Sequence, residues 1–184
     1  GNPDMDRATR ASQALVRELL PWLPMDAVVM EFGCGLGLHS IALAPYCKRV
    51  VGIDISRRLL QLAKKLAREV DNVSFLWYDG GVLPFESETF DLVFSMGVFE
   101  RIVKSRVQKY LADIRRILNA NGRAFLYFLS NRAIGTEFTQ RLGKQSYFYY
   151  TDTEAAVAVS NARMEVIEIL KKPAAVIVVA RRSR

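Results

Sequence analysis

The segment Glu31–Gly37 places three closely spaced glycines after an acidic residue, and this pattern predicts a ligand-binding loop. A short apolar run, Ala27–Phe32, precedes the glycines and a helical pattern follows them, so the loop joins a predicted strand to a predicted helix. Gly33, Gly35 and Gly37 let the backbone turn sharply and approach a ligand, while the helix offers free N–H groups to polar or anionic atoms. The alternative is a tight strand-to-helix turn that binds nothing.

Acidic residues stand at three successive predicted strand ends, at Glu31, Asp54 and Asp79. The carboxyl ends of parallel strands meet at one edge of a sheet, so we expect these side chains to converge on one crevice. Asp54 ends the second predicted strand, where a doubly wound sheet places a carboxylate against ribose hydroxyls, because a carboxylate accepts two hydrogen bonds at once. Asp54 could instead cap the next helix, although Ser56 is also placed to do so.

The elements that position these residues alternate between helix and strand. An amphipathic helix is expected over 7–20, followed by strands at 27–32, 49–54, 73–77, 90–95 and 123–129 and helices at 38–46, 57–70 and 104–118. A turn is expected at Leu118–Gly122, since Asn and Gly suit the left-handed conformations that end a helix. This alternation predicts a parallel sheet with right-handed crossovers.

The last part of the chain predicts a different connection. Thr151–Glu154 has the form of a capping box that opens a helix to about Asn161. Strands at 164–170 and 174–180 follow, and the short link between them implies an antiparallel hairpin. We therefore expect one α/β domain over residues 1–184, with a leading segment and helix in 1–24. Residues 25–184 are expected to form a Rossmann-like, doubly wound, mostly parallel seven-stranded sheet with a C-terminal antiparallel hairpin.

Composition and charge narrow the function classes. A chain of 184 residues that is 51% hydrophobic and 24% charged is long enough to bury one core. We expect a soluble, cytoplasmic protein without a membrane partner, because no apolar run is long enough to span a bilayer and the start does not look like a secretory signal. Cys34, Cys47 and the single histidine, His39, do not make a zinc set, so no metal is expected. The net charge of +7 is spread over helices, which makes nucleic acid the less favoured partner.

Dinucleotide-binding enzymes use a related glycine loop, but its spacing differs. Their pattern is G-x-G-x-x-G, whereas Gly33, Gly35 and Gly37 give G-x-G-x-G and Leu38 occupies the third glycine position counted from Gly33. An NAD(P)-dependent oxidoreductase is therefore an alternative that this spacing disfavours.

From about Ala8 onward the sequence resembles the class I methyltransferases, in particular the small enzymes with a bare Rossmann-like core. Glu31–Gly37 is similar to their first motif, and Val51–Ser56, Asp79–Phe85 and Phe90–Val93 are similar to later ones. The resemblance implies S-adenosylmethionine as cofactor. The cofactor-binding residues that it implies are Glu31, Gly33, Gly35 and Gly37 around the methionine part, Asp54 on the ribose, Ile55, Asp79 and Gly80 on the adenine, and Ser95 and Met96 at the end of the fourth strand.

The resemblance leaves the acceptor and the catalytic residues unassigned. Many members of the family have a histidine where this chain has Arg101, so a role for that histidine does not transfer. Methyl transfer from a sulfonium is an in-line displacement with a neutral leaving group, and a base is needed only if the acceptor must lose a proton. Candidates for such a base are Glu100, Tyr147, Tyr149 and His39. Packing or capping is the favoured interpretation of His39, and the alternative for Glu100 and Arg101 is that they are solvated charges at a helix start.

The aromatic run Tyr147–Tyr150 lies in the longest irregular connection, 130–150, where this architecture places substrate-facing loops. The competing and favoured interpretation is that alternate rings pack over the sheet edge as a short strand. We expect a small-molecule acceptor, because no inserted domain is present to bind a macromolecule. A non-catalytic S-adenosylmethionine-binding module remains the alternative function.

Overall fold

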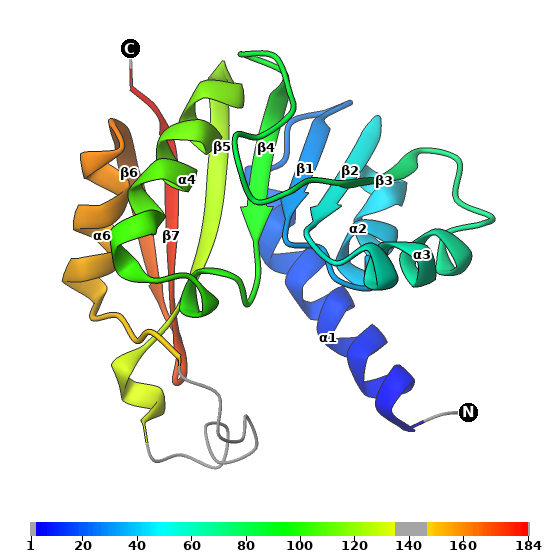
Figure 1. Cartoon of the computed structure of the whole chain (residues 1–184), viewed down its shortest axis with the longest axis horizontal. Coiled ribbons are helices and arrows are strands. Elements are labelled where there is room, and N and C mark those ends of the chain that lie inside the picture. The colour runs from blue at the N-terminus through cyan, green and yellow to red at the C-terminus, as the bar shows by residue number, and fades with distance from the viewer. Residues whose placement is uncertain (1–2, 135–146, 184) are drawn as a thin grey trace.

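The computed structural model describes residues 3–134 and 147–183. In these ranges the chain forms a seven-stranded sheet with the strand order β3-β2-β1-β4-β5-β7-β6 (Figure 1). The strands are β1 (Val28–Phe32), β2 (Arg49–Asp54), β3 (Val73–Trp77), β4 (Phe90–Ser95), β5 (Leu118–Leu129), β6 (Met164–Lys171) and β7 (Ala175–Arg182). Neighbouring strands are parallel from β3 to β5, and β7 is antiparallel to both β5 and β6. The predicted fold class, with its C-terminal hairpin, is confirmed.

Helices cover both faces of the sheet. They are α1 (Pro3–Leu19), α2 (Leu38–Leu43), α3 (Arg57–Leu66), α4 (Lys104–Ile117) and α6 (Asp152–Asn161), and short 3-10 turns are η1 (Leu20–Trp22), η2 (Ala44–Tyr46), η3 (Phe99–Arg101) and η4 (Asn131–Ala133). Leu19 of α1 and Leu43 of α2 belong to the core on one face, together with Phe94. Leu111 of α4 and Val159 of α6 belong to the core on the other face. Figure 1 shows α4 and α6 lying over β5–β7.

The sheet reverses its direction of winding beside β1. From β1 the chain first moves outward to β2 and β3, and it then returns to the other side of β1 as β4. In doubly wound sheets the crossover loops separate at this point and leave a crevice outside the carboxyl ends of the strands. The glycine loop after β1 and the loop after β4 therefore flank this position.

Local capping signals act as the sequence predicts. Thr151 and Glu154 form the capping box of α6: the Thr151 Oγ1 accepts a bond from the Glu154 N–H at 3.1 Å, and the Glu154 carboxylate accepts one from the Thr151 N–H at 2.8 Å. Ser56 is the N-cap of α3 and accepts a bond from the Leu59 N–H at 3.3 Å. Such bonds satisfy backbone donors that the first turn of a helix leaves free.

The predicted turn at Leu118–Gly122 is wrong, because this segment is the first part of β5. None of Asn119, Asn121 and Gly122 has a positive φ, so no left-handed residue ends α4. The pairing of β4 with β5 is instead irregular near Phe90, and a Cβ on Gly122 would lie 2.9 Å from the Phe90 carbonyl oxygen. Gly122 thus has no room for a side chain, because it lies close to Phe90 of β4 and to the backbone of Asn119 in its own strand, which a helix-ending pattern does not reveal.

Two helices are shorter than predicted. α2 ends at Leu43, where the 3-10 turn η2 with Pro45 takes over, and α3 ends at Leu66 rather than at Val70. Proline has no N–H to continue a helical ladder, which accounts for the end of α2. Across 3–134 and 147–183, no helix combines the length and the apolar character that crossing a membrane requires.

Candidate functional site

The glycine loop joins β1 to α2 and is held against the end of β2. Gly33 and Cys34 both donate their backbone N–H groups to the Ile53 carbonyl, at 2.9 Å. Gly33, Gly35 and Gly37 have φ values of 77°, 53° and 71°, a region that residues with a Cβ rarely adopt. The loop therefore needs glycine at all three positions to keep this path.

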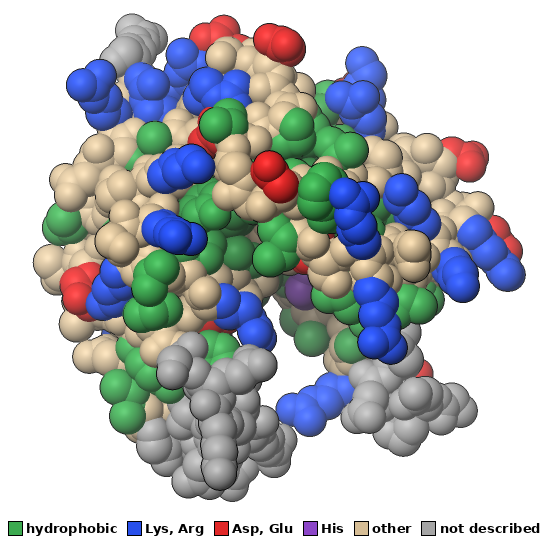
Figure 2. Space-filling view, in the orientation of Figure 1, with side chains coloured by type: hydrophobic (Ala, Val, Ile, Leu, Met, Phe, Trp, Pro, Cys, Tyr) green, Lys and Arg blue, Asp and Glu red, His purple; other side chains and the backbone are tan. Residues whose placement is uncertain are grey.

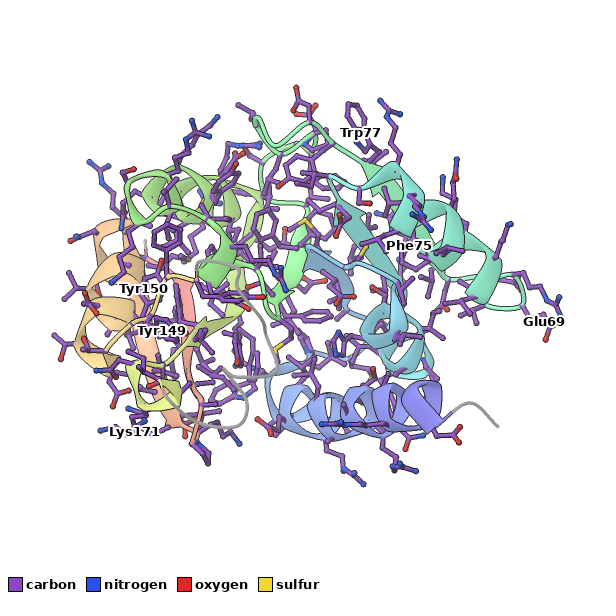
Figure 3. All side chains as sticks on the ribbon, turned by 60° about the horizontal axis from the view of Figure 1, so that its bottom comes forward. Glu69, Phe75, Trp77, Tyr149, Tyr150 and Lys171 are labelled. Carbon is purple, nitrogen blue, oxygen red and sulfur yellow. The ribbon has the colours of Figure 1, made fainter. Side chains whose placement is uncertain are left out.

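The three glycines differ in what surrounds them. A Cβ on Gly33 would collide with the side chain of Val98, and one on Gly37 would collide with the ring of Phe75, which is labelled in Figure 3. A Cβ on Gly35 would meet no atom within 4 Å. The protein itself fills the space beside the outer two glycines and leaves the space beside Gly35 open to a ligand.

The Asp54 carboxylate connects the end of β2 directly to this loop. One of its oxygens accepts a bond from the Gly35 N–H at 2.9 Å, and the other accepts one from the Ser56 N–H at 2.8 Å. Ser56 rather than Asp54 caps α3, so the capping interpretation of Asp54 is wrong. Asp54 and Gly35 thus belong to one site.

Glu31 is placed differently from the other acidic residues. Its side chain is 1% exposed and faces the first turn of α2, where one oxygen accepts bonds from the N–H and hydroxyl of Ser40 and the other lies 3.0 Å from His39 Nδ1. The expected convergence of three carboxylates on an open crevice is therefore wrong for Glu31. This carboxylate holds β1, the glycine loop and α2 together, and His39 is a partner in that packing.

Asp79 and Gly80 begin the connection from β3 to β4 and lie beside Ile55. A Cβ on Gly80 would lie 3.8 Å from a methyl group of Ile55, whose side chain is 64% exposed. Tyr78 is buried beneath this loop, and burial, together with the charges of Asp54 and Asp79 among others, raises the pKa of its phenol. The structure therefore brings Asp54, Ile55, Asp79 and Gly80 into one neighbourhood.

Helix α4 fixes this connection from the other side. The Tyr110 hydroxyl donates to the Gly80 carbonyl at 2.8 Å. Arg116 donates to the carbonyls of Leu83 and Phe85 and also bonds Asp113, whose carboxylate accepts a bond from the Leu83 N–H. These positioning residues are not predicted from the sequence, because no motif links α4 to a loop so distant in the chain.

Ser95 is the last residue of β4, and Met96 follows it. Ser95 is fully buried and its hydroxyl has no hydrogen-bond partner among the described residues, whereas Met96 packs with the core that α1 covers. Met96 also lines an apolar groove of about 400 Å³ between α1 and the C-terminal hairpin. The roles of Ser95 and Met96 toward the cofactor remain predictions.

The region after β4 contains a buried carboxyl. Glu100 is 6% exposed, so it is not a solvated helix-start charge as predicted, whereas its neighbour Arg101 is exposed. The helix begins only at Lys104, and Glu100 and Arg101 lie in the 3-10 turn η3. Burial raises the pKa of Glu100, and its own backbone N–H and the charge of Arg101 offset this only in part.

The run Tyr147–Tyr150 passes over this region, while most of the predicted connection, 135–146, lies outside the described residues. Phe148 and Tyr150 pack against the core and Tyr150 makes one parallel bridge with Ser130, so the favoured packing of alternate rings is confirmed, although a strand does not form. Tyr149 and Tyr150 lie beside α6 and the hairpin, and Trp77 lies at the opposite side of the molecule (Figure 3).

A second hollow, of about 510 Å³, lies at the amino ends of β2 and β3 and is lined by Lys48, Arg49 and Asp71 among others. It is larger than the groove beside α1. The glycine loop, however, lies at the carboxyl ends of the strands, so this hollow is remote from the candidate site.

In the view of Figure 2, Lys and Arg side chains are spread over the whole face. Among the described residues, no group of three His, Cys, Asp or Glu side chains is arranged to hold a metal ion.

A family model described as a methyltransferase domain matches residues 30–126, more than half of the chain. The chain belongs to the methyltransferase domain family. The match covers the glycine loop, Asp54, the Asp79–Gly80 loop and the end of β4. The predicted family, with S-adenosylmethionine as its cofactor, is confirmed, and the oxidoreductase alternative is set aside.

Relatives of this methyltransferase domain have little sequence identity to it. An uncharacterized methyltransferase, YcgJ of Bacillus subtilis, is 27% identical over 63% of this chain and 47% of its own length. A demethylmenaquinone methyltransferase of Tropheryma whipplei is 32% identical over 52% of this chain and 38% of its own length. The chain therefore matches less than half of either relative. A SAM-dependent methyltransferase of Methanosarcina mazei has the same fold, with a TM-score of 0.75 and 16% identity over 90% of this chain and 96% of its own.

Proposed function

We propose that this methyltransferase domain transfers the methyl group of S-adenosylmethionine to a small-molecule acceptor. The observation that carries the proposal is the open space beside Gly35, next to the bond from the Gly35 N–H to the Asp54 carboxylate. A Cβ would occupy part of that space, whereas the equivalent spaces beside Gly33 and Gly37 are filled by the protein. The residues present thus fit a ligand with a polar edge that approaches bare backbone.

Each part of the cofactor has candidate residues. Gly35 and the neighbouring loop backbone would hold the methionine part, Asp54 would accept bonds from the ribose hydroxyls, and Ile55, Asp79 and Gly80 would contact the adenine. Glu31 contributes indirectly by fixing the loop to α2 through Ser40. When bound, the sulfonium supplies an activated methyl group with a neutral leaving group, so the chain's main contribution is to position the two reactants.

The acceptor class is supported by the groove beside α1 and by one relative. The groove is mostly apolar and of a size suited to a small molecule, and Met96, directly after β4, is one of the residues that line it. One relative is named a demethylmenaquinone methyltransferase, and the acceptor in that name is a small, largely apolar molecule. Together these support an apolar small-molecule acceptor over a macromolecule.

Calorimetry and a transfer assay test the proposal. We expect S-adenosylmethionine and S-adenosylhomocysteine to bind with micromolar or lower Kd, and NADH not to bind. Methyl transfer from radiolabelled cofactor to members of an acceptor panel would then distinguish the enzyme from a non-catalytic binding module. Failure of both adenosyl ligands to bind would contradict the proposed function.

A further inference from the structure

The peptide unit between Ile55 and Ser56 is held at both ends by side chains. Its carbonyl oxygen accepts a bond from the Trp77 indole Nε1–H at 2.9 Å, and its N–H donates to the Asp54 carboxylate at 2.8 Å. Because a peptide unit is planar, these two bonds fix its orientation. The other oxygen of the same carboxylate accepts the bond from the Gly35 N–H. The indole, the peptide unit, the carboxylate and the glycine loop thus form one connected set of hydrogen bonds.

Trp77 is brought to this peptide unit by the edge strand of the sheet. It is the last residue of β3 and is paired with Asp54 in the parallel register, so its indole starts beside the end of β2. The guanidinium carbon of Arg57 lies 3.5 Å from the centre of its ring, which places a cation over one face of the indole. Trp77 is 37% exposed and lies at the rim of the molecule in Figure 3. Strand pairing and this stack therefore hold the indole, rather than burial in a core.

The facing side of this neighbourhood is held in the same manner. The Tyr110 hydroxyl donates to the Gly80 carbonyl at 2.8 Å, and a Cβ on Gly80 would lie 3.8 Å from a methyl group of Ile55. Ile55 and Gly80, which we propose for the adenine, are thus each fixed through a backbone carbonyl by an aromatic donor. The bond from Tyr110 comes from a helix, whereas the bond from Trp77 comes from the edge of the sheet.

We propose that Trp77 is a positioning residue of the cofactor site. Its indole N–H sets the orientation of the peptide unit between Ile55 and Ser56, and thereby directs the Asp54 carboxylate toward the ribose hydroxyls and the Ile55 side chain toward the adenine. This inference rests on the proposed function. Without the indole N–H, water satisfies the exposed carbonyl in several orientations, so the peptide unit is free to tilt. Binding of the adenosyl part must then order the site, and that cost lowers the affinity.

Matched variants and matched probes test this role without requiring turnover. Trp77→Phe removes the indole N–H but keeps an aromatic ring beside Arg57. Trp22→Phe makes the same change in the other tryptophan of the chain, which packs against the core that α1 covers. The probes are S-adenosylhomocysteine and 5′-methylthioadenosine, which shares the adenine and ribose but lacks the amino-acid part. Calorimetry measures both affinities, and urea denaturation gives the folded fraction of each protein, so that the affinities of the folded proteins are compared.

We expect Trp77→Phe to weaken both probes about three- to tenfold and by similar factors, because the indole acts on the adenosyl part that they share. Trp22→Phe should change either affinity by less than about twofold. Unchanged affinities in Trp77→Phe would overturn the proposal, even if stability fell, because the indole would then have a structural role alone. So would a loss confined to S-adenosylhomocysteine, an equal loss in Trp22→Phe, or a wild type that binds S-adenosylhomocysteine but not 5′-methylthioadenosine. Failure of the wild type to bind S-adenosylhomocysteine would instead contradict the proposed function.

Discussion

At the scale of single residues, the glycines of one motif have different physical reasons to be glycine. All three need a positive φ, but Gly33 and Gly37 also face side chains of the protein, whereas Gly35 faces open space. The sequence pattern gives the three equal weight. Only their surroundings separate the residues that shape the loop from the one that leaves room for a ligand.

Replacing Gly37 by alanine should therefore mainly lower the stability of the fold, whereas replacing Gly35 by alanine should mainly weaken ligand binding. Gly37→Ala should reduce the free energy of unfolding by about 3 kcal/mol, because it adds a collision with Phe75 to the cost of the positive φ. Gly35→Ala should cost only about 1 to 2 kcal/mol in stability but weaken S-adenosylhomocysteine binding about tenfold or more. Urea denaturation and calorimetry measure the two effects. Unchanged affinity in Gly35→Ala would show that the open space is not used.

Asp54 is the second residue with a specific prediction. Asp54→Asn should weaken cofactor binding by about 1 to 3 kcal/mol, because it removes the charged acceptor proposed for the ribose hydroxyls. Asp71→Asn is the matched control, since Asp71 is an exposed aspartate at the opposite edge of the sheet. Calorimetry with S-adenosylhomocysteine measures both, and equal affinities would remove the ribose assignment of Asp54.

At the scale of elements, α4 positions a loop that it does not adjoin in sequence. The Tyr110 hydroxyl holds Gly80, and Arg116 with Asp113 holds the loop at Leu83. The loop after β3 has no regular structure of its own, so these bonds fix its path over Tyr78. The part of the candidate site that we propose for the adenine therefore depends on a helix from the other half of the sheet.

Tyr110→Phe removes one of these bonds and leaves the ring. We expect a loss of about 0.5 to 1.5 kcal/mol in stability and a severalfold loss in cofactor affinity, since the Gly80 carbonyl loses its donor. Tyr46→Phe changes an exposed tyrosine and should alter neither property. If denaturation and calorimetry gave the same values for both variants, the Tyr110 bond would have no role in positioning the loop.

At the scale of the whole molecule, the burial of Glu100 is produced by segments that meet only in the folded chain. Arg101, Tyr127 and Tyr150 are the charged or titratable groups that act electrostatically with it. The pKa values of Tyr127 and Tyr150 are raised to about 12, so both phenols stay neutral between pH 4 and 8, as Arg101 stays charged. Glu100 is then the carboxyl of this set, and burial raises its pKa.

The stability difference between Glu100→Gln and the wild type should therefore depend on pH. Burial raises the pKa of Glu100 in the folded state, so its contribution to stability is fully present below the pKa of the unfolded chain and is lost as pH rises through the folded value. Glutamine does not ionise, and the advantage of the variant should grow as pH rises through that window. Urea denaturation between pH 4 and 8 measures it, and a difference independent of pH would contradict the burial of an ionising carboxyl.

The sequence by itself determined the strand positions up to β4, the capping box of α6, the C-terminal hairpin and the pairing of the glycine loop with Asp54. These features follow from side-chain period, turn chemistry and short spacings, which act over a few residues. Only the tertiary structure decided that the Glu31 carboxylate bonds Ser40 and lies against His39, that 118–122 is strand, and that one carboxyl oxygen of Glu100 is buried without a partner among the described residues. Those outcomes depend on contacts between distant segments, such as Phe148 with Glu100, and local patterns do not contain that information.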